Sequence, residues 1–393
     1  MHHFETTGGH AGTAGGWTVS LYFHIPFCAG SCAYCDFYSI DLSDLSARSK
    51  TAVNTTLDRY GEALERDLAR LPENLVIPTV YLGGGTPSVL GAPRIGRLLS
   101  ALRGVLRNRP AEITVEANPE SVTEPFLRVC RETGVTRVSL GIQTFHEPSR
   151  KAVGRTGSAD NNALSLVREY FGGAFSVDLM TGLPLQDERV LLRDIEQIVS
   201  RGPEHISLYA LTAEHGSPLE KRLPDPDAAD ALWIRGRDAL RDNGYEQYEV
   251  SNFSLPGKQS AHNIRYWRME SWIGLGAAAS STLIDEETGS AARFTFAPDI
   301  DAFIRGEPPD FEALDRNTLI KETVLMGFRY RAGPDAARFH RRFGVRIEDI
   351  IPRTLAAWRE KGLLEPEKPA LTEAGLLFLN RFLRDAFTEI DRP

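Results

Sequence analysis

The stretch FHIPFCAGSCAYCDFYS, residues 23–39, contains Cys28, Cys32 and Cys35 in the spacing Cys-x3-Cys-x2-Cys. Three thiolates on one short loop can ligate three irons of a cubane [4Fe–4S] cluster, which leaves the fourth iron without a protein ligand. The amine and carboxylate of S-adenosylmethionine (SAM) can chelate such an open iron. The spacing therefore predicts a [4Fe–4S] cluster and SAM as cofactors. An electron from a reductant would then release a 5′-deoxyadenosyl radical.

Two other uses of these cysteines remain open. A zinc site would need a fourth ligand, for which His24 or Asp36 is available. The chain contains no second Cys/His pair at zinc spacing, which favours the cluster. A disulfide framework is disfavoured, because only Cys130 lies outside the loop. Cys130 falls in an amphipathic helical pattern, where we expect a small buried side chain.

Length, charge and cysteine content set the broad class. A chain of 393 residues is long enough for one large domain and a smaller one. A net charge of −8 gives no overall basic surface for nucleic acid, and no apolar run reaches membrane-spanning length. Free thiolates on a loop favour a reducing, cytoplasmic location. Residues 1–16 lack the apolar core of a signal peptide, so we expect a flexible tail.

The fold is predicted from alternating strand and helix patterns over residues 17–253. Repeated βα units imply a parallel sheet with helices outside it, and about six units suggest a full or partial barrel. The expected strands are residues 18–25, 78–83, 112–117, 136–142, 175–182, 204–211 and 245–250.

Polar features follow several of these strands directly. The cysteine loop follows the first strand and GGGTPS, residues 83–88, follows the second, while Glu116, Gln143 and Asp178 lie at or near later strand ends. Because active sites of βα barrels gather at the carboxyl ends of the strands, we expect one convergent site. The glycine segment could receive the amino-acid end of SAM, Glu116 an amine and Asp178 ribose hydroxyls.

Each of these features also has a structural explanation. GGGTPS could be a tight turn, and Glu116 could be solvated. Arg155 could reach a ribose or carboxylate, or could form a surface ion pair. Tyr22 and Tyr34 could pack on the cofactor or belong to the core.

In combination the motifs resemble a known family. The segments LYFHIPFCAGSCAYCDFYS, YLGGGTPS, VEANPE, SLGIQTF, VDLMTGLPLQ and HISLYALT resemble the radical SAM enzymes of the oxygen-independent coproporphyrinogen III oxidase group. Within that group they are most similar to the HemW haem chaperones. The resemblance implies a partial (βα)6 radical SAM barrel whose cluster is ligated by Cys28, Cys32 and Cys35. It implies SAM contacts from Tyr22, Tyr34, Gly84, Gly85, Thr86, Glu116, Gln143, Arg155 and Asp178.

Two features distinguish the subgroups of this family. Phe37 stands where the oxidases carry a further cysteine, and HNIRYW, residues 262–267, resembles the haem motif of the HemW group. The resemblance implies His262 as an axial ligand of haem iron, with Tyr266 and Trp267 as flat apolar surface. A His–Tyr pair four residues apart, packed against the barrel, is the alternative. Alanines at 278 and 279 stand where relatives often carry a histidine, so a second ligand is absent.

From about residue 312 the pattern becomes helical and resembles a small winged-helix-like domain, which in the family covers the barrel mouth. The expected division is therefore a tail (1–16), a radical SAM barrel with an extension that carries HNIRYW (17–311), and a helical C-terminal domain (312–393). Nucleic-acid binding is the alternative role of this last domain, because it contains Arg331, Arg338, Arg341, Arg342 and Arg346.

The expected function is that of a haem chaperone that passes haem to acceptor haemoproteins. The alternative is oxygen-independent coproporphyrinogen III oxidase activity, so whether the protein is an enzyme stays open. A structural zinc protein that binds nucleic acid is a third possibility.

Overall fold

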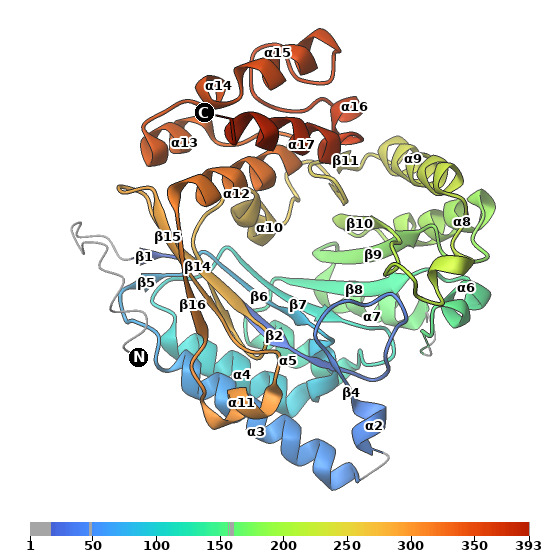
Figure 1. Ribbon diagram of the computed structural model, residues 1–393. Helices are drawn as coiled ribbons and strands as arrows, with labels where there is room; N and C mark the ends of the chain where they lie inside the picture. The colour runs from blue at the N-terminus through green and yellow to red at the C-terminus, as the bar shows by residue number, and fades with distance from the viewer. Residues whose placement is uncertain (1–16, 47–48, 156, 158–160, 393) are drawn as a thin grey trace.

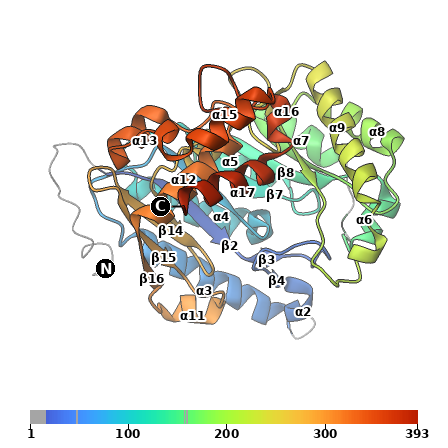
Figure 2. The same cartoon turned by 45° about the horizontal axis from the view of Figure 1, so that its top comes forward.

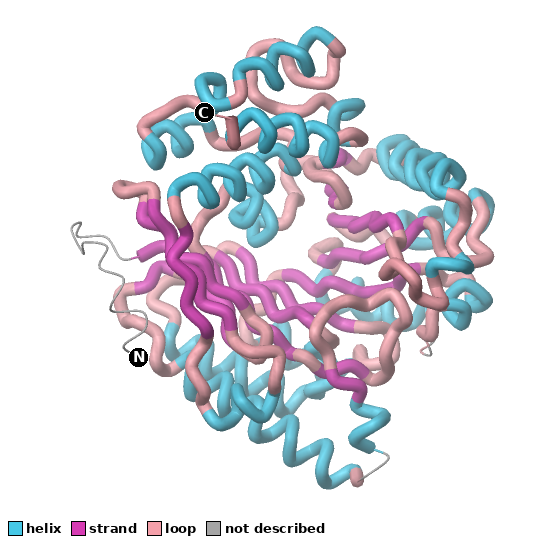
Figure 3. Tube along the Cα trace, viewed as in Figure 1, coloured by secondary structure: helices cyan, strands magenta, loops and turns pink. Residues whose placement is uncertain are grey.

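The computed structural model describes residues 17–46, 49–155, 157 and 161–392, so the tail expected at residues 1–16 lies outside the described part. A sheet of twelve strands runs through the described chain in the order β11-β12-β10-β9-β8-β7-β6-β2-β13-β14-β15-β16 (Figures 1 and 3). Of the helices that the structure describes, none combines the length and apolar character needed for a membrane crossing.

The middle of this sheet, as described, contains six parallel strands that succeed one another along the chain. They are β2 (Ser20–Ile25), β6 (Thr79–Gly84), β7 (Glu112–Ala117), β8 (Arg137–Gln143), β9 (Phe175–Thr181) and β10 (His205–Ala210). The outer face is covered by α3 (Lys50–Leu68), η1 (Pro87–Leu90), α4 (Gly91–Val105), α5 (Glu124–Glu132), α6 (Glu147–Ala152), α7 (Asn161–Phe171), α8 (Glu188–Val199) and α9 (Pro226–Asp242). The predicted partial (βα)6 barrel is confirmed.

Side chains alternate between the two faces of the sheet along these strands. In β7 the apolar residues Ile113 and Val115 join the core under the helices, whereas Glu112 and Glu116 make polar contacts on the concave face. The other parallel strands follow the same rule, with Ser20, Tyr81 and Asp178 among the concave residues. Because strand side chains have a period of two, this sequence pattern builds a barrel with an apolar exterior layer and a polar interior.

The two edges of the sheet depart from the βα pattern. The run expected at 245–250 is only β11 (Glu246–Gln247), which forms an antiparallel pair with β12 (Asn252–Ser254) instead of adding a βα unit. Beyond β2 lie β13 (Trp272–Leu275), β14 (Ser280–Asp285), β15 (Ser290–Thr295) and β16 (Asp310–Leu314), of which only β13 pairs in parallel. Shorter elements are β1 (Trp17–Thr18), β3 (Phe27–Cys28), β4 (Ile40–Asp41), α2 (Leu42–Ser46), β5 (Leu75–Val76), η2 (Glu220–Arg222), α10 (Ala261–Trp267) and α11 (Ile300–Arg305).

The C-terminal helices have a hydrophobic core of their own, in which Phe382 packs on Phe328 and Trp358 with ring centroids 4.4 and 5.2 Å apart. They are α12 (Arg316–Arg329), α13 (Ala336–Phe343), α14 (Ile347–Ile350), α15 (Pro352–Glu360), α16 (Glu373–Leu376) and α17 (Leu379–Ile390). A single bridge between Leu364 and Leu371 forms a minimal wing. The boundary expected at residue 312 falls inside β16, and the domain division stays a prediction.

The C-terminal helices contact the barrel at the amino-terminal ends of its strands. Tyr330 donates to Gln259, whose backbone contacts Arg137 at the start of β8. In Figure 1 these helices lie on the side of α10, and Figure 2 shows them away from β3 and β4. We expected the C-terminal domain to cover the barrel mouth, where the cysteine loop lies. These contacts instead place its helices at the opposite end of the strands.

The basic residues of these helices are partly neutralised by the barrel. Arg338 lies 2.8 Å from Glu270, and Arg342 lies 2.7 Å from Glu286. The arginines that suggested nucleic-acid binding thus include two that pair with carboxylates of the same chain.

The hydroxyl of Tyr60 in α3 makes hydrogen bonds that link this helix to the sheet, and their contribution to stability can be tested. Its buried hydroxyl donates to the carbonyl of His24 (2.8 Å) and accepts from the amide of Ala277 (2.9 Å). Tyr60→Phe would leave both backbone groups buried without a partner, so we expect a loss of about 1–3 kcal/mol in the free energy of unfolding. Urea unfolding of the apo-protein measures it. Tyr170→Phe, at a surface hydroxyl, is the control and should change stability by less than about 0.5 kcal/mol.

Candidate functional site

The cysteine loop begins where β3 ends and is closed by the pairing of β3 with β4. Asp41 of β4 accepts hydrogen bonds from the amides of Ser31 in the loop (2.9 Å) and Ser43 in α2 (2.8 Å), which ties the first part of the loop to the segment that follows it. Cys28 is half-buried, Cys35 is exposed, and both are free thiols. Partial desolvation of the sulfur atoms raises the pKa of both thiols, that of Cys35 included although the residue is exposed overall. Because metal ligation requires thiolates, binding of a cluster here would release protons.

The remaining cysteine differs from these three. Cys130 in α5 is 0% exposed and belongs to the apolar layer under the helices. Its burial raises the pKa of the thiol to about 12. The expectation of a small buried side chain is confirmed, and Cys130 is inert compared with the loop.

Within the described residues, no group of three or more His, Cys, Asp or Glu side chains is arranged as the ligands of a single metal ion. His24, considered as a fourth zinc ligand, has both ring nitrogens in hydrogen bonds, to the Tyr22 hydroxyl and the Tyr38 carbonyl, each at 3.0 Å. In this arrangement His24 is held by the protein's own hydrogen bonds.

Arg155 joins the cysteine loop to the strand ends. One guanidinium nitrogen lies 3.8 Å from the Cys32 sulfur and 3.2 Å from the Tyr34 hydroxyl, and the other donates to Asn118 at 2.9 Å. Arg155 is 7% exposed, and it is no surface residue. On the other side of the loop, the Thr86 hydroxyl lies 3.6 Å from the Cys28 sulfur. The predicted residues Tyr34, Thr86 and Arg155 are thus brought together around the loop.

Two carboxylates face the concave interior nearby. Glu116 accepts from the Tyr81 hydroxyl (2.6 Å) and the Gly84 amide (3.2 Å). Burial raises the pKa of Glu116 to about 7, and the charge of Asp178 contributes in the same direction. Burial also raises the pKa of Asp178 to about 6, while Ser207, Ser139 and Arg155 oppose that rise. Such carboxylates are poised to gain a cationic or hydroxyl-bearing partner.

Gln143 ends β8 in a strained conformation. Its φ is 65°, in the left-handed region that few residues other than glycine adopt. The pairing of β8 with β9 shifts register between Gly141 and Gln143, and the buried side-chain oxygen of Gln143 has no hydrogen-bond partner in the protein. Strain together with an unpaired buried acceptor fits a group held ready for a ligand donor.

Gly84 and Gly85 are required by the protein's own packing. A Cβ on Gly84 would lie 2.5 Å from the His24 ring, and one on Gly85 would lie 2.8 Å from the Phe27 backbone. The Gly85 and Thr86 amides donate to the carbonyls of Ile25 (3.0 Å) and Phe27 (2.8 Å). These amides are therefore occupied, and the segment acts first as the joint between β6 and the cysteine loop.

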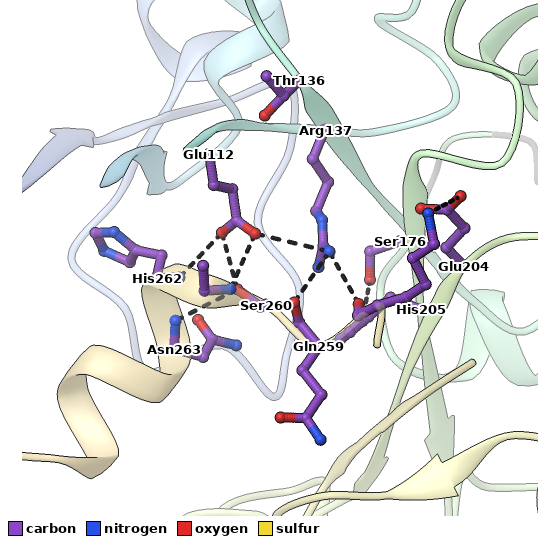
Figure 4. Close-up of polar contacts among 12 residues, drawn as sticks. Glu112, Thr136, Arg137, Ser176, Glu204, His205, Gln259, Ser260, His262 and Asn263 are labelled. Carbon is purple, nitrogen blue, oxygen red and sulfur yellow. Dashed lines mark hydrogen bonds and ion pairs between the residues drawn. The ribbon is translucent and has the colours of Figure 1, made fainter. Parts of the chain in front are cut away.

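The HNIRYW motif lies beside Glu112 and Arg137, at the amino-terminal ends of β7 and β8 (Figure 4). The cysteine loop, by contrast, follows the carboxyl end of β2. Glu112, the first residue of β7, accepts from the amides of Ala261 (3.0 Å) and His262 (3.1 Å) at the start of α10. Arg137 lies 3.6 Å from the same carboxylate and donates to the carbonyl of Lys258. This buried pair clamps the segment that leads into the motif.

His262 itself is 1% exposed and uses both ring nitrogens, with Thr79 at 2.9 Å and Tyr266 at 3.3 Å. Its ring stacks on Tyr81 with centroids 5.1 Å apart, and burial lowers the pKa of His262 to about 3. Trp267 lies under the guanidinium of Arg329 at 4.9 Å. In this arrangement His262 and Tyr266 form the packed pair that was the alternative interpretation, and the haem-ligand role stays a prediction.

Sequence reasoning missed Tyr81 and Asn118. Tyr81 contacts Glu116 at one end of the interior and His262 at the other, and its ring also stacks on Tyr22 at 6.3 Å. Its concave position in YLGGGTPS was the available signal. Asn118 lies two residues after Glu116 in VEANPE, on the same side of a strand end, and that spacing would have identified it.

Comparison with known proteins agrees with this geometry. Residues 22–198 match the family model of the Radical SAM superfamily, and residues 314–378 match that of the HemN C-terminal domain. The structure of coproporphyrinogen III oxidase HemN from Escherichia coli, a radical SAM enzyme, has a TM-score of 0.78 at 21% identity, over 96% of this chain and 92% of that chain. The fold is thus that of a radical SAM protein with a HemN-type C-terminal domain.

Sequence similarity narrows the class further. The heme chaperone HemW of Escherichia coli is 33% identical over 93% of this chain and 97% of its own length. The HemW of Lactococcus lactis is 32% identical over 84% and 86%. A mouse mitochondrial protein, radical S-adenosyl methionine domain-containing protein 1, is 33% identical over 80% and 74%. The chain belongs to the HemW family.

Because the pKa of Glu116 is raised, the free energy of unfolding should depend on pH. Since this pKa is about 7, above the ordinary value of 4.5, the fold favours the protonated carboxyl. Its contribution is complete below pH 4.5 and is lost as the pH rises through 7. In the apo-protein, the stability of Glu116→Gln relative to wild type should therefore increase between pH 4.5 and 8, by up to about 3 kcal/mol. Urea unfolding at each pH measures it, and a difference that does not vary with pH would contradict it.

Proposed function

We propose that this protein is a haem chaperone of the HemW type that binds a [4Fe–4S] cluster, SAM and haem, and passes haem to an acceptor haemoprotein. The observation that carries the proposal is the cysteine loop, where three free thiols lie beside a buried arginine at the carboxyl ends of the barrel strands. The family membership supports haem as the cargo, since relatives bear the name heme chaperone. A cytoplasmic location and a reductant for the cluster belong to the same proposal.

Cys28, Cys32 and Cys35 would ligate the cluster, which together with SAM supplies radical chemistry when it is reduced. Thr86 and Arg155 lie beside two of the sulfurs and would donate hydrogen bonds to them. Such bonds are among the means by which proteins tune cluster potentials.

The SAM contacts follow from the charges of the interior. Glu116 would receive the SAM ammonium, because a carboxyl with a pKa near 7 ionises readily beside a cation. Asp178 would bind the ribose hydroxyls, and Arg155 would bind the SAM carboxylate. Gln143 offers its unpaired oxygen to a donor of SAM. Tyr22 and Tyr34 would pack on the cofactor.

The sequence suggests that the segment containing Gly84, Gly85 and Thr86 receives the amino-acid end of SAM, but their backbone amides would not make the contact. Their amides already donate within the protein, so contact with SAM would use backbone carbonyls or the Thr86 side chain. The free acceptors of a carbonyl suit an ammonium group.

Haem would be recognised through the HNIRYW segment. For the Nε2 atom of His262 to ligate iron, it must give up its hydrogen bond with the Tyr266 hydroxyl, while Nδ1 can keep its contact with Thr79. The Trp267 ring and the neighbouring Arg329 would then offer a flat surface and a positive charge for a porphyrin and its propionates.

The cluster is tested by composition. After anaerobic reconstitution the wild-type protein should hold about four irons and four sulfides per chain. Replacement of Cys28, Cys32 or Cys35 by Ala should abolish this content, because each change removes one of three ligands. Cys130→Ala is the matched control and should retain the full content. Stoichiometric zinc without sulfide in anaerobically purified wild type would contradict the proposal.

Haem binding is tested by titration monitored at the Soret band. If His262 supplies the axial nitrogen, His262→Ala should weaken binding and change the spectrum. Tyr266→Phe should strengthen binding, because it removes a hydrogen bond that competes for the ring nitrogen. The same preparations should convert coproporphyrinogen slowly or not at all, since Phe37 replaces the oxidase cysteine. Haem binding that is unchanged in both variants would make His262 purely structural, and robust conversion would favour the oxidase.

A further inference from the structure

Asn118 follows β7 directly and connects two parts of the site that are distant in sequence. Its side-chain nitrogen lies 3.0 Å from the Thr86 hydroxyl, and its side-chain oxygen lies 2.9 Å from Arg155. Thr86 in turn contacts Cys28, and Arg155 contacts Cys32. A single amide group therefore stands between the contacts to two of the three loop cysteines.

The direction of each hydrogen bond in the series from Thr86 through Asn118 to Arg155 follows from donor and acceptor chemistry. A guanidinium has only donors, so the oxygen of Asn118 must face Arg155 and the NH2 group must face Thr86. The Thr86 oxygen then accepts from Asn118. Since a hydroxyl has one hydrogen, that hydrogen remains available to the Cys28 sulfur, 3.6 Å away.

On the Arg155 side of this series, the hydrogen bonds hold a buried charge. Arg155 is 7% exposed, and its Nε has no hydrogen-bond partner in the protein. Besides Asn118 its guanidinium contacts the Gly141 carbonyl, the Tyr34 hydroxyl and the Cys32 sulfur. A buried charge needs its hydrogen-bond partners, so loss of the Asn118 oxygen would free the guanidinium to move away from Cys32.

We propose that Asn118 is a positioning residue that sets the hydrogen bonds to Cys28 and Cys32 and thereby tunes the cluster and orients Arg155 toward SAM. The inference rests on the proposed function, because it requires the cluster and SAM. It assigns Asn118 no contact with either group. Its effect passes through Thr86 on one side and Arg155 on the other.

Asn118→Asp distinguishes the contact with Thr86 from the contact with Arg155. The carboxylate keeps an acceptor for Arg155 but has no donor for Thr86, whose hydroxyl would then donate to Asp and leave Cys28. Loss of a donor to sulfur and an added negative charge both disfavour reduction, so the midpoint potential of the reconstituted cluster should become more negative than in wild type. A spectroscopic redox titration measures it, and an unchanged potential would overturn the Thr86 half of the proposal.

Asn118→Ala removes the oxygen that holds Arg155. The dissociation constant of SAM, measured by equilibrium dialysis on reconstituted protein, should increase about tenfold, the size expected for one lost hydrogen bond to a charged group. An unchanged constant would overturn the Arg155 half. Iron and sulfide content is measured on every variant, so that a failure to assemble the cluster is seen directly.

Asn108→Ala is the matched control. Asn108 also bonds through both amide atoms, to the amide (2.9 Å) and the carbonyl (2.8 Å) of Ile77, in a loop that makes no part of the cysteine site. It should leave the potential and the SAM constant as in wild type, and equal shifts in Asn108→Ala and the Asn118 variants would overturn the inference. Wild-type protein that holds neither cluster nor SAM would overturn the proposed function and the inference with it.

Discussion

The site depends on the close contact between the end of β6 and the cysteine loop. Gly84 and Gly85 pack so tightly on His24 and Phe27 that no side chain fits there, and the following amides donate to the carbonyls of β2 and β3. This contact holds Cys28 beside Thr86. Because Glu116 accepts from the Gly84 amide, the same joint also fixes the carboxylate of the next strand. The loop is therefore held against the sheet by close packing and backbone hydrogen bonds along β6.

Much of this arrangement could be predicted from the sequence, because parallel strands leave a regular pattern. The limits expected for the strand at 112–117 are those of β7, and the polar residues that follow successive strands do converge. Strand alternation and the carboxyl-end rule suffice for that result. The antiparallel pairing at the sheet edges was not predicted. β11 covers only two residues of the run expected at 245–250, β12 is three residues long, and β14, β15 and β16 were not among the expected strands.

Contacts across strands were beyond sequence reasoning for a different reason. Asn118 meets Thr86 and Arg155, which are 32 and 37 residues away along the chain, and spacing does not report such pairs. The burial of His262 is similar, because its partner Thr79 is 183 residues distant. The HNIRYW motif could be located in sequence, whereas its position at the amino-terminal ends of the strands needed the structure.

Tyr81 spans the barrel interior between these two ends, with its hydroxyl on Glu116 and its ring on His262. A shift of this one side chain changes the surroundings of the carboxylate and of α10 together. Linkage then requires reciprocity: whatever factor a ligand at Glu116 applies to affinity at α10, a ligand at α10 applies to affinity at Glu116. Under the proposed function, SAM at Glu116 and haem at α10 would each change the affinity for the other through this one aromatic ring.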